Sequence, residues 1–186
     1  TPLPEDSVSV APNKLKVSNV SNPFYFPAKQ TYTVSSRNIV AMATATTALS
    51  TVQFGQFPLY VFTGEGVFAL SVGTGDIAYA NSFSVTRDVC NNPDSIVSTD
   101  DAIVFSTDSG LKVLSGSTVR DISSDMEGYL PTAVDSSPII KKIAGVGGFS
   151  DKLSSTEFIY YLEEAKVGYN YEDKEVIVAN RNYPYS

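Results

Sequence analysis

Two stretches that repeat one another decide the fold, LYVFTGEGVFALSV at residues 59–72 and IVFSTDSGLKVLSG at residues 103–116. Each consists of a run of β-branched and aromatic residues, a short turn that contains glycine, and a second apolar run. The copies lie 44 residues apart, and at that offset Gly66 matches Gly110. Both glycines stand where a tight hairpin needs a positive φ. The sequence therefore predicts two successive hairpins of the same design.

A related third strand is predicted after each hairpin, at residues 85–89 and 118–122. The spacer before the first of these is longer, and we expect residues 74–82 to form a loop. A period of about 44 residues with three or four short strands is typical of a propeller blade, because one small twisted sheet must stack on neighbouring copies to bury both faces. Similar hairpins in an ordinary β-sandwich would leave the same pattern, so both interpretations stay open. We expect a mainly β fold of β-propeller-like, antiparallel blades, either an incomplete propeller or a fragment of one.

The segments that flank the repeats divide the chain into three parts. Residues 1–37 are rich in Pro, Ser and Asn and are expected to run over the surface as an extended arm or edge. Residues 38–123 hold the two blade-like repeats, preceded by a strand that begins at Ile39. Residues 124–186 are expected to form a loop, one short helix near 154–165 and a C-terminal hairpin. We expect a single compact unit that belongs to a longer protein.

The residue types present exclude several kinds of chemistry. The chain contains no histidine and one cysteine, Cys90. A zinc site of the usual kind and a Ser-His or Cys-His nucleophile pair therefore cannot be built. We expect Cys90 to fill space in the core, with a reactive thiol as the alternative. We expect no cofactor.

The charge and hydropathy pattern limits the partners. The formal net charge is −7, which argues against binding to nucleic-acid phosphates, since that binding depends on Lys and Arg. No run approaches the roughly 18 apolar residues that a membrane-spanning helix needs. We expect no membrane span and no signal peptide.

Two glycine-rich segments are candidates for phosphate-binding loops. Residues 64–69 (GEGVFA) match the dinucleotide pattern Gly-x-Gly-x-x-Ala, but that motif must open a helix, and the residues that follow resemble a strand. Residues 145–150 (GVGGFS) lack the Lys-Ser/Thr ending of a phosphate loop. We expect a hairpin turn for the first and a connector for the second.

Acidic residues supply the other candidates for chemistry. The carboxylate pairs are Asp100-Asp101, Glu163-Glu164 and Glu172-Asp173, with Asp121, Asp125 and Glu127 also available. A glycosidase would need two of them brought together in space, and Asp125, Glu127 and Asp135 could hold calcium, although their spacing fits no loop template. Pairs of this kind are normally solvated. We therefore expect no enzyme, and no catalytic, cofactor-binding or metal-binding residue is assigned.

An Arg-Asp pair recurs at the same place in both predicted third strands, as Arg87-Asp88 and Arg120-Asp121. The repetition favours a ladder of charges along one edge of successive blades. Two exposed ion pairs of little energetic weight are the alternative.

Several phrases of the sequence resemble bacteriophage neck and tail proteins, particularly virion structural proteins of phages and prophages from gut Bacteroides-type hosts. The resemblance covers roughly residues 22–123, and residues 169–186 look like the opening of a further blade. The phrases are NPFYFP at 22–27, QFGQFPLYVFT at 53–63, RDVCNNPDSI at 87–96 and LSG at 114–116.

This resemblance implies a mechanical role and supplies no site residues. The chain would be a component of the head-to-tail connector, the tail nozzle or a DNA-stabilising part of the particle. It would be located in the virion after synthesis in the bacterial cytoplasm. Its partners would be other virion proteins and further copies of itself, with DNA at most passing by. An acidic surface that lines the DNA path would repel the DNA and let it slide.

Two other classes of function remain as alternatives. The first is a carbohydrate- or protein-binding module at a cell surface, in which exposed tyrosines stack on sugars; the candidates are Tyr79, Tyr129, Tyr160 and Tyr183. The second is a fragment of a propeller-type glycoside hydrolase whose carboxylates converge in a channel.

Overall fold

The computed structural model describes residues 10–47, 56–123 and 155–182. Within these residues the protein is mainly β, with four antiparallel sheets and one α-helix. The expectation of a mainly β fold is therefore confirmed. The described strands do not close into a barrel.

Two of the sheets have four strands, and each is a simple meander. The first sheet consists of β3 (Ile39–Thr44), β4 (Leu59–Thr63), β5 (Gly66–Val72) and β6 (Tyr79–Thr86), in that order. The second sheet consists of β7 (Val97–Ser98), β8 (Ile103–Thr107), β9 (Gly110–Ser115) and β10 (Thr118–Asp121), in that order.

The smaller elements are two hairpins and three helical segments. The hairpins are β1 (Lys14–Lys16) with β2 (Thr31–Thr33), and β11 (Ala165–Asn170) with β12 (Glu175–Asn180). The helical segments are the 3-10 turns η2 (Ala28–Gln30) and η4 (Pro93–Ser95) and the α-helix α3 (Ser155–Glu163).

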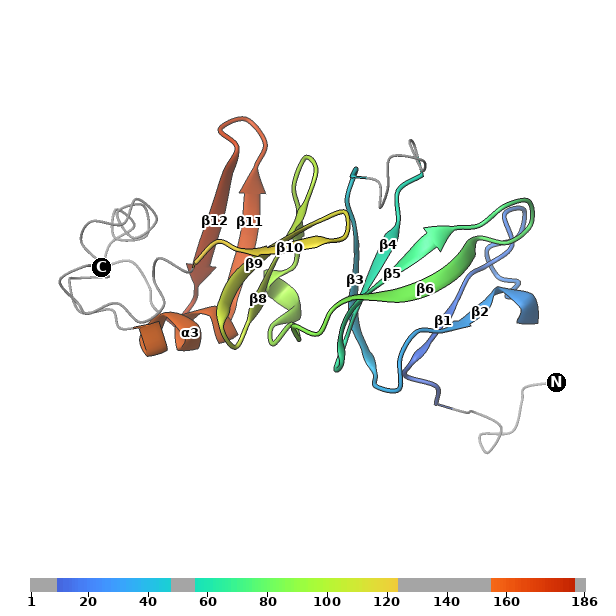
Figure 1. Ribbon diagram of the computed structural model, residues 1–186, viewed down its shortest axis with the longest axis horizontal. Helices are drawn as coiled ribbons and strands as arrows, with labels where there is room; N and C mark the ends of the chain where they lie inside the picture. The colour runs from blue at the N-terminus through green and yellow to red at the C-terminus, as the bar shows by residue number, and fades with distance from the viewer. Residues whose placement is uncertain (1–9, 48–55, 124–154, 183–186) are drawn as a thin grey trace.

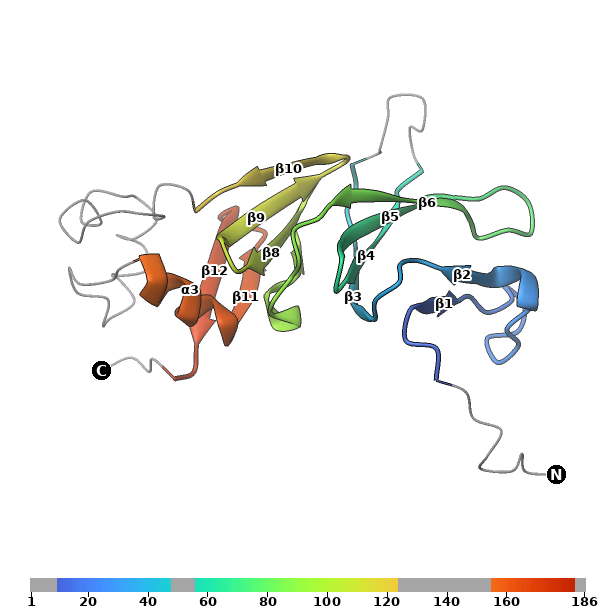
Figure 2. The ribbon, with the colours of Figure 1, turned by 60° about the horizontal axis from the view of Figure 1, so that its bottom comes forward.

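These elements follow one another as layers along the long axis of the molecule. Figures 1 and 2 both show the β1–β2 hairpin at one end, then the first sheet, then the second sheet, and finally α3 with the β11–β12 hairpin. Each four-stranded sheet therefore has a neighbour on both of its faces.

The repeated sequence forms the same turn twice. Thr63 Oγ1 donates to the Gly66 carbonyl at 2.9 Å, and Thr107 Oγ1 donates to the Gly110 carbonyl at 3.1 Å. Both glycines have a φ of +125°, a conformation that side chains with a Cβ rarely adopt. The β4–β5 and β8–β9 hairpins thus appear where the sequence predicts them.

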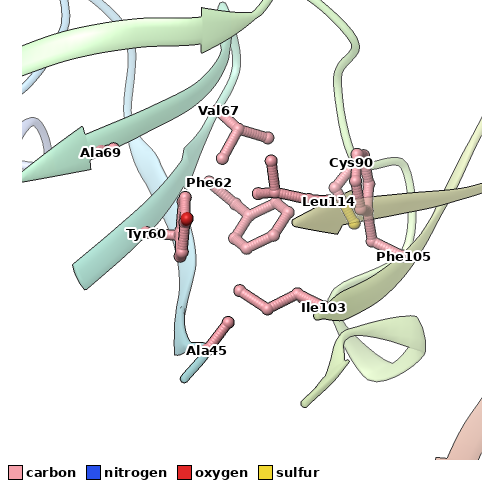
Figure 3. Packing of buried hydrophobic residues seen from close by; sticks show 9 residues of the cluster. All are labelled: Ala45, Tyr60, Phe62, Val67, Ala69, Cys90, Ile103, Phe105 and Leu114. Carbon is pink, nitrogen blue, oxygen red and sulfur yellow. The ribbon is translucent and has the colours of Figure 1, made fainter. Parts of the chain in front are cut away.

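The first and second sheets pack face to face through one apolar cluster, which we call the inter-sheet core (Figure 3). Within it, Phe62 of the first sheet meets Phe105 of the second, their rings edge to face with centroids 5.2 Å apart. Tyr60 adds a hydrogen bond between the two sheets, because its hydroxyl donates to the Gly116 carbonyl, directly after β9, at 2.7 Å. Burial raises the pKa of Tyr60 to about 12. The members of the inter-sheet core are Ala45, Tyr60, Phe62, Val67, Ala69, Cys90, Ile103, Phe105 and Leu114.

Equivalent residues of the two repeats face in the same direction along the stack. Tyr60 and Val67 of the first sheet point into the inter-sheet core. Their counterparts 44 residues later, Val104 and Leu111, point away from that core and pack against α3 and the β11–β12 hairpin. The face of each sheet that carries these residues therefore packs against the layer that follows in the sequence.

The opposite faces obey the same rule. Val61 and Leu70 of the first sheet pack against the β1–β2 hairpin, whereas their counterparts Phe105 and Leu114 pack against the first sheet. In a sandwich related by a two-fold axis, equivalent residues would face one another across the core. Here the two sheets contact each other through non-equivalent faces, so they stack head to tail.

Residues 10–37 form a layer of their own. The segment expected as an extended arm or edge holds the β1–β2 hairpin in its described part, and Leu15, Tyr32 and Val34 pack on the outer face of the first sheet. The exposed residues Lys14, Lys16 and Thr33 belong to the same two strands. The hairpin thus covers an apolar face and adds polar groups to the surface.

One part of the strand prediction was wrong, and one strand was missed. β6 begins at Tyr79, inside the segment expected as a loop, and it ends at Thr86. Its start is fixed by a distant residue, since the Tyr79 backbone N–H donates to the Tyr32 hydroxyl at 3.1 Å and the two rings meet edge to face. The two-residue strand β7, which completes the second sheet, was not predicted because it is too short to leave a pattern.

The helix prediction is confirmed. α3 lies within the expected range, and Phe158, Tyr161 and Leu162 form the buried stripe that the spacing predicts. The helix is fixed to η4 by Asn92, whose side-chain amide donates to the carbonyls of Leu162 at 2.9 Å and Ala165 at 2.6 Å. Asn92 is itself buried.

We expect Asn92→Ala to lower the free energy of unfolding by about 2–3 kcal/mol, because two buried carbonyls lose their donor. Urea denaturation followed by circular dichroism measures the change. The exposed Asn81→Ala is the control and should stay within about 0.5 kcal/mol of the wild type. Equal stability of the Asn92→Ala variant and the wild type would contradict this account of how α3 is held.

Candidate functional site

Polar and aromatic side chains converge where the second sheet meets the β11–β12 hairpin. Asp100, in the β7–β8 turn, accepts hydrogen bonds at Oδ2 from Lys174 Nζ at 2.6 Å and from the Tyr169 hydroxyl at 3.0 Å. The Tyr171 hydroxyl donates to the Ser98 carbonyl at 3.1 Å. We call these five residues the Asp100 cluster.

The turn between β11 and β12 places Lys174 against Asp100. Asn170 organises this turn, since its Oδ1 accepts from the Glu172 backbone N–H at 3.0 Å and its Nδ2 donates to Asp173 Oδ2 at 2.7 Å. Lys174 has a φ of +58°, in the left-handed region that residues with a Cβ rarely adopt. Positions of this kind are common at functional sites and ligand clamps.

The charges of the Asp100 cluster stabilise one another. The hydrogen bond from Lys174, followed by that from Tyr169, lowers the pKa of Asp100 below its ordinary value. The hydrogen bond to Asp100 raises the pKa of Lys174. Desolvation, followed by the hydrogen bond to Asp100, raises the pKa of Tyr169. Asp100 is therefore held as a carboxylate, which suits binding and does not suit a general acid, whose pKa must be raised.

A pH prediction follows from the lowered pKa of Asp100. Its contribution to stability is fully present above the ordinary value of 3.8 and is lost as the pH falls through the lower, folded-state pKa. Asp100→Asn should be less stable than the wild type at pH 7, and the difference should shrink at pH 3. The effect should be small because the pair is exposed to solvent.

Urea denaturation midpoints at the two pH values measure this effect. Asp108→Asn, in the exposed β8–β9 turn, is the matched control. Its stability difference from the wild type should change less between pH 7 and pH 3 than that of Asp100→Asn. An Asp100→Asn variant as stable as the wild type at pH 7 would show that the contact with Lys174 contributes nothing.

A second polar site joins the two four-stranded sheets. Lys112 of β9 lies between Asp88 and Asp121, with Nζ–Oδ distances of 3.7 and 3.5 Å. Its side chain is only 14% exposed. The aspartates of the two repeated Arg-Asp pairs therefore meet at one lysine, while Arg87 and Arg120 are exposed. Sequence reasoning singled out the two pairs but missed Lys112, which stands on a different strand from either pair.

Cys90 lies in the inter-sheet core, and its thiol donates to the Asn92 carbonyl at 3.2 Å. Burial raises the pKa of the Cys90 thiol, which disfavours the reactive thiolate. These contacts support the interpretation of Cys90 as a residue that fills the core.

Among residues 10–47, 56–123 and 155–182, the remaining sequence candidates do not come together as a catalytic site. Residues 64–69 form the β4–β5 turn and the start of β5, so no helix N-terminus is available for a pyrophosphate. Glu163 and Glu164 lie at the end of α3, and Glu172 and Asp173 lie in the β11–β12 turn. The candidates that lie outside the described residues are Asp125, Glu127, Tyr129, Asp135, residues 145–150 and Tyr183.

The tyrosines were only partly identified from the sequence. Tyr79 was expected to be exposed but is half-buried against Tyr32, because β6 begins there and packs on the β1–β2 hairpin. Tyr160 is 60% exposed on α3. Tyr169 and Tyr171, whose rings meet edge to face at 4.8 Å, were missed. In the sequence, their alternation with Asn170 indicates only a strand.

No group of three or more His, Cys, Asp or Glu side chains within residues 10–47, 56–123 and 155–182 is arranged to hold a metal ion. Nor does any helix in the part of the chain that the structure describes have the length and apolar character needed to span a bilayer.

No protein-family model matches the chain, and no curated protein is significantly similar to it.

Proposed function

We propose that this chain is a non-enzymatic structural component of a bacteriophage virion, at the head-to-tail connector or in the tail, where copies assemble around the path of the DNA. The observation that carries the proposal is the head-to-tail stacking of the first sheet on the second. Propeller-like and solenoid proteins extend a rigid body by repeating a unit in this way. The resemblance of residues 22–123 to phage neck and tail proteins suggests the particle in which such a body serves.

The distribution of polar groups supports a mechanical role. Asn92, Lys112 and Tyr60, which are buried or largely buried, each join one layer to the next through hydrogen bonds or ion pairs. Polar groups of this kind make a stack specific in its register. Because the net charge is −7, a channel wall built from this chain would repel the DNA that passes through and would not bind it.

The test is quantitative mass spectrometry of purified phage particles from a host that carries the gene. The peptide to follow is the tryptic product from Asp88 to Lys112. We expect it at a low, fixed ratio to the major capsid protein, as for a connector or tail component. Detection only in the cell fraction would overturn the proposal.

The Asp100 cluster supports a second candidate function, a carbohydrate-binding module. Exposed aromatic rings beside a carboxylate can stack on a sugar and accept hydrogen bonds from its hydroxyls. Tyr171 is exposed, and Asp100 is ionised next to Tyr169. A glycan array would test this function, with binding that is lost in Tyr171→Ala. An array without binding would remove the candidate.

A further inference from the structure

One end of the molecule carries a row of exposed apolar side chains. In the loop that joins β1 to η2, Val20 is fully exposed, Phe24 is 90% exposed, and the next two residues, Tyr25 and Phe26, are each more than half exposed. Apolar side chains are unfavourable in water, so a contiguous group of them indicates an interaction surface. Their high exposure also means that they protrude from the body of the protein. We call residues 20–26 the aromatic loop.

The aromatic loop has a defined shape. The Asn19 backbone N–H donates to the Tyr25 carbonyl at 2.8 Å, which closes the loop. Within it, Asn22 Oδ1 accepts from the Phe24 backbone N–H at 3.0 Å, and Asn19 Oδ1 accepts from the Ser21 backbone N–H at 2.9 Å. A loop that is ordered before it binds loses little conformational entropy on binding.

The loop between β5 and β6 adds to the apolar surface at this end. It is held against η2, since Lys29 Nζ lies 3.3 Å from Asp76 Oδ2 and Gln30 Nε2 donates to the Asp76 carbonyl at 3.0 Å. Ile77, the next residue of this loop, is 48% exposed. Figures 1 and 2 both show the β5–β6 loop at the same end of the long axis as the β1–β2 hairpin. We call the aromatic loop together with Ile77 the apolar tip.

The charge of the chain changes sign along the long axis. Residues 1–37 contain four basic and two acidic residues, and both acidic ones precede the described part of the chain. Residues 56–123 contain eight acidic and three basic residues, and residues 155–182 contain six acidic and three basic ones. The apolar tip therefore lies at the basic end of an acidic molecule. The basic residues of this end are Lys14, Lys16, Lys29 and Arg37.

Two lysines of β1 precede the aromatic loop. Lys16 ends β1, and Lys14 lies on the same side of the strand because alternate residues share a face. Leu15, between them, faces the other way and packs on the first sheet. Both lysines are exposed, and neither has an ion-pair partner within residues 10–47, 56–123 and 155–182. Two cations next to the apolar tip are thus available to an anionic partner.

A protruding apolar tip with cations at its base fits the surface of an anionic phospholipid bilayer. Aromatic and aliphatic side chains enter the boundary between head groups and acyl chains, while lysines near them attract the phosphates. A second copy of the chain offers a poorer partner. The hollow beside β3 is open and is lined by more polar than apolar surface, so it provides no apolar cavity for the tip.

We propose that this end of the molecule binds an anionic phospholipid bilayer, with the apolar tip inserted among the head groups and Lys14 and Lys16 against their phosphates. The acidic remainder of the chain then points away from the membrane, because the negative surface attracts one end and repels the other. The contact is peripheral and uses no membrane-spanning segment. The inference goes beyond the proposed virion function and does not depend on it.

Co-sedimentation with vesicles made of equal parts phosphatidylcholine and phosphatidylglycerol is the first test. We expect the chain to bind these vesicles, to bind phosphatidylcholine alone more weakly, and to be released by high salt. The double variant Phe24→Ser with Phe26→Ser should bind about tenfold or more weakly, since two aromatic side chains no longer leave water. Phe83→Ser, on β6 outside the apolar tip, is the matched control and should bind as the wild type does.

The lysines have a charge-matched control. Lys14→Gln with Lys16→Gln should weaken binding to the mixed vesicles by about tenfold, because each lysine near the surface contributes to the attraction. Lys166→Gln with Arg181→Gln changes the net charge by the same amount, but both residues are exposed at the opposite end of the molecule. This second double variant should bind nearly as tightly as the wild type.

Fluorescence provides an independent measurement of insertion. The chain contains no tryptophan, so Phe24→Trp places a single reporter in the aromatic loop. Its emission should shift to shorter wavelength when the mixed vesicles are added, because the indole ring leaves water. Phe83→Trp is the matched control, and its emission should stay unchanged.

Three results would overturn the proposal: no binding of the wild type to the mixed vesicles, undiminished binding by Phe24→Ser with Phe26→Ser, or equal binding to phosphatidylcholine alone. Self-association through the apolar tip by a chain that leaves vesicles unbound would also overturn it and would assign the tip to a protein contact. The virion proposal is tested separately, because detection of the Asp88–Lys112 peptide in particles does not depend on membrane binding.

Discussion

Gly66→Ala is expected to destabilise the chain by about 3 kcal/mol or more, enough to prevent stable folding of a marginal domain. The residue has a φ of +125°, and a Cβ there would lie 2.2 Å from the Thr86 carbonyl oxygen and 2.7 Å from the Arg87 Cα. These are backbone atoms at the end of β6 and directly after it, so they cannot turn aside as the end of a side chain can. Urea denaturation followed by circular dichroism measures the loss.

Gly168→Ala is the matched control in β11. Gly168 has no positive φ, and an added Cβ would meet no atom within 4 Å. Because glycine weakens a strand interior, the change should leave stability unaltered or raise it by up to about 1 kcal/mol. If Gly66→Ala and Gly168→Ala had equal effects, the close approach of β6 to the β4–β5 turn would be refuted.

Phe105→Ala should cost about 3–5 kcal/mol, because it opens a cavity in the inter-sheet core. Phe105 is fully buried, and its ring meets that of Phe62 at 5.2 Å. A double-mutant cycle with Phe62→Ala should give a coupling energy of about 0.5–1.5 kcal/mol for the edge-to-face pair. Equilibrium denaturation of the four proteins supplies the cycle.

Phe83→Ala is the control for the loss of an aromatic side chain. Phe83 is 39% exposed on the outer strand β6, so its removal should cost about 1–2 kcal/mol, less than that of the fully buried Phe105. Similar losses for Phe83→Ala and Phe105→Ala would mean that the two sheets do not share a core. The measurement therefore tests the packing of one layer on the next.

The repeated hairpins could be predicted because every determinant of them is local. The alternation of apolar residues, a threonine at the end of the first strand and a glycine three positions later are enough to form each turn, and they recur at Thr63-Gly66 and Thr107-Gly110. The helix stripe of Phe158, Tyr161 and Leu162 is local in the same sense. Local patterns of this kind can be recognised in a single sequence.

The features that escaped prediction depend on residues far apart in the chain. β6 starts where Tyr79 meets Tyr32, 47 residues earlier. Lys112 lies between Asp88 and Asp121 because two sheets pack together, and no spacing in the sequence reveals this. The Asp100 cluster joins residues about 70 positions apart, as the bond from Tyr169 to Asp100 shows. Such contacts can be identified only when the packing of the layers is known.

The shared orientation of the two repeats has a consequence for how a gene of this kind can change in length. A unit whose front fits the back of its own copy can be duplicated or deleted as a block, and the new neighbours already fit one another. A sandwich has no such freedom, since its two halves are complementary only to each other. Variants of this chain should therefore differ by whole units of about 44 residues more readily than by single strands.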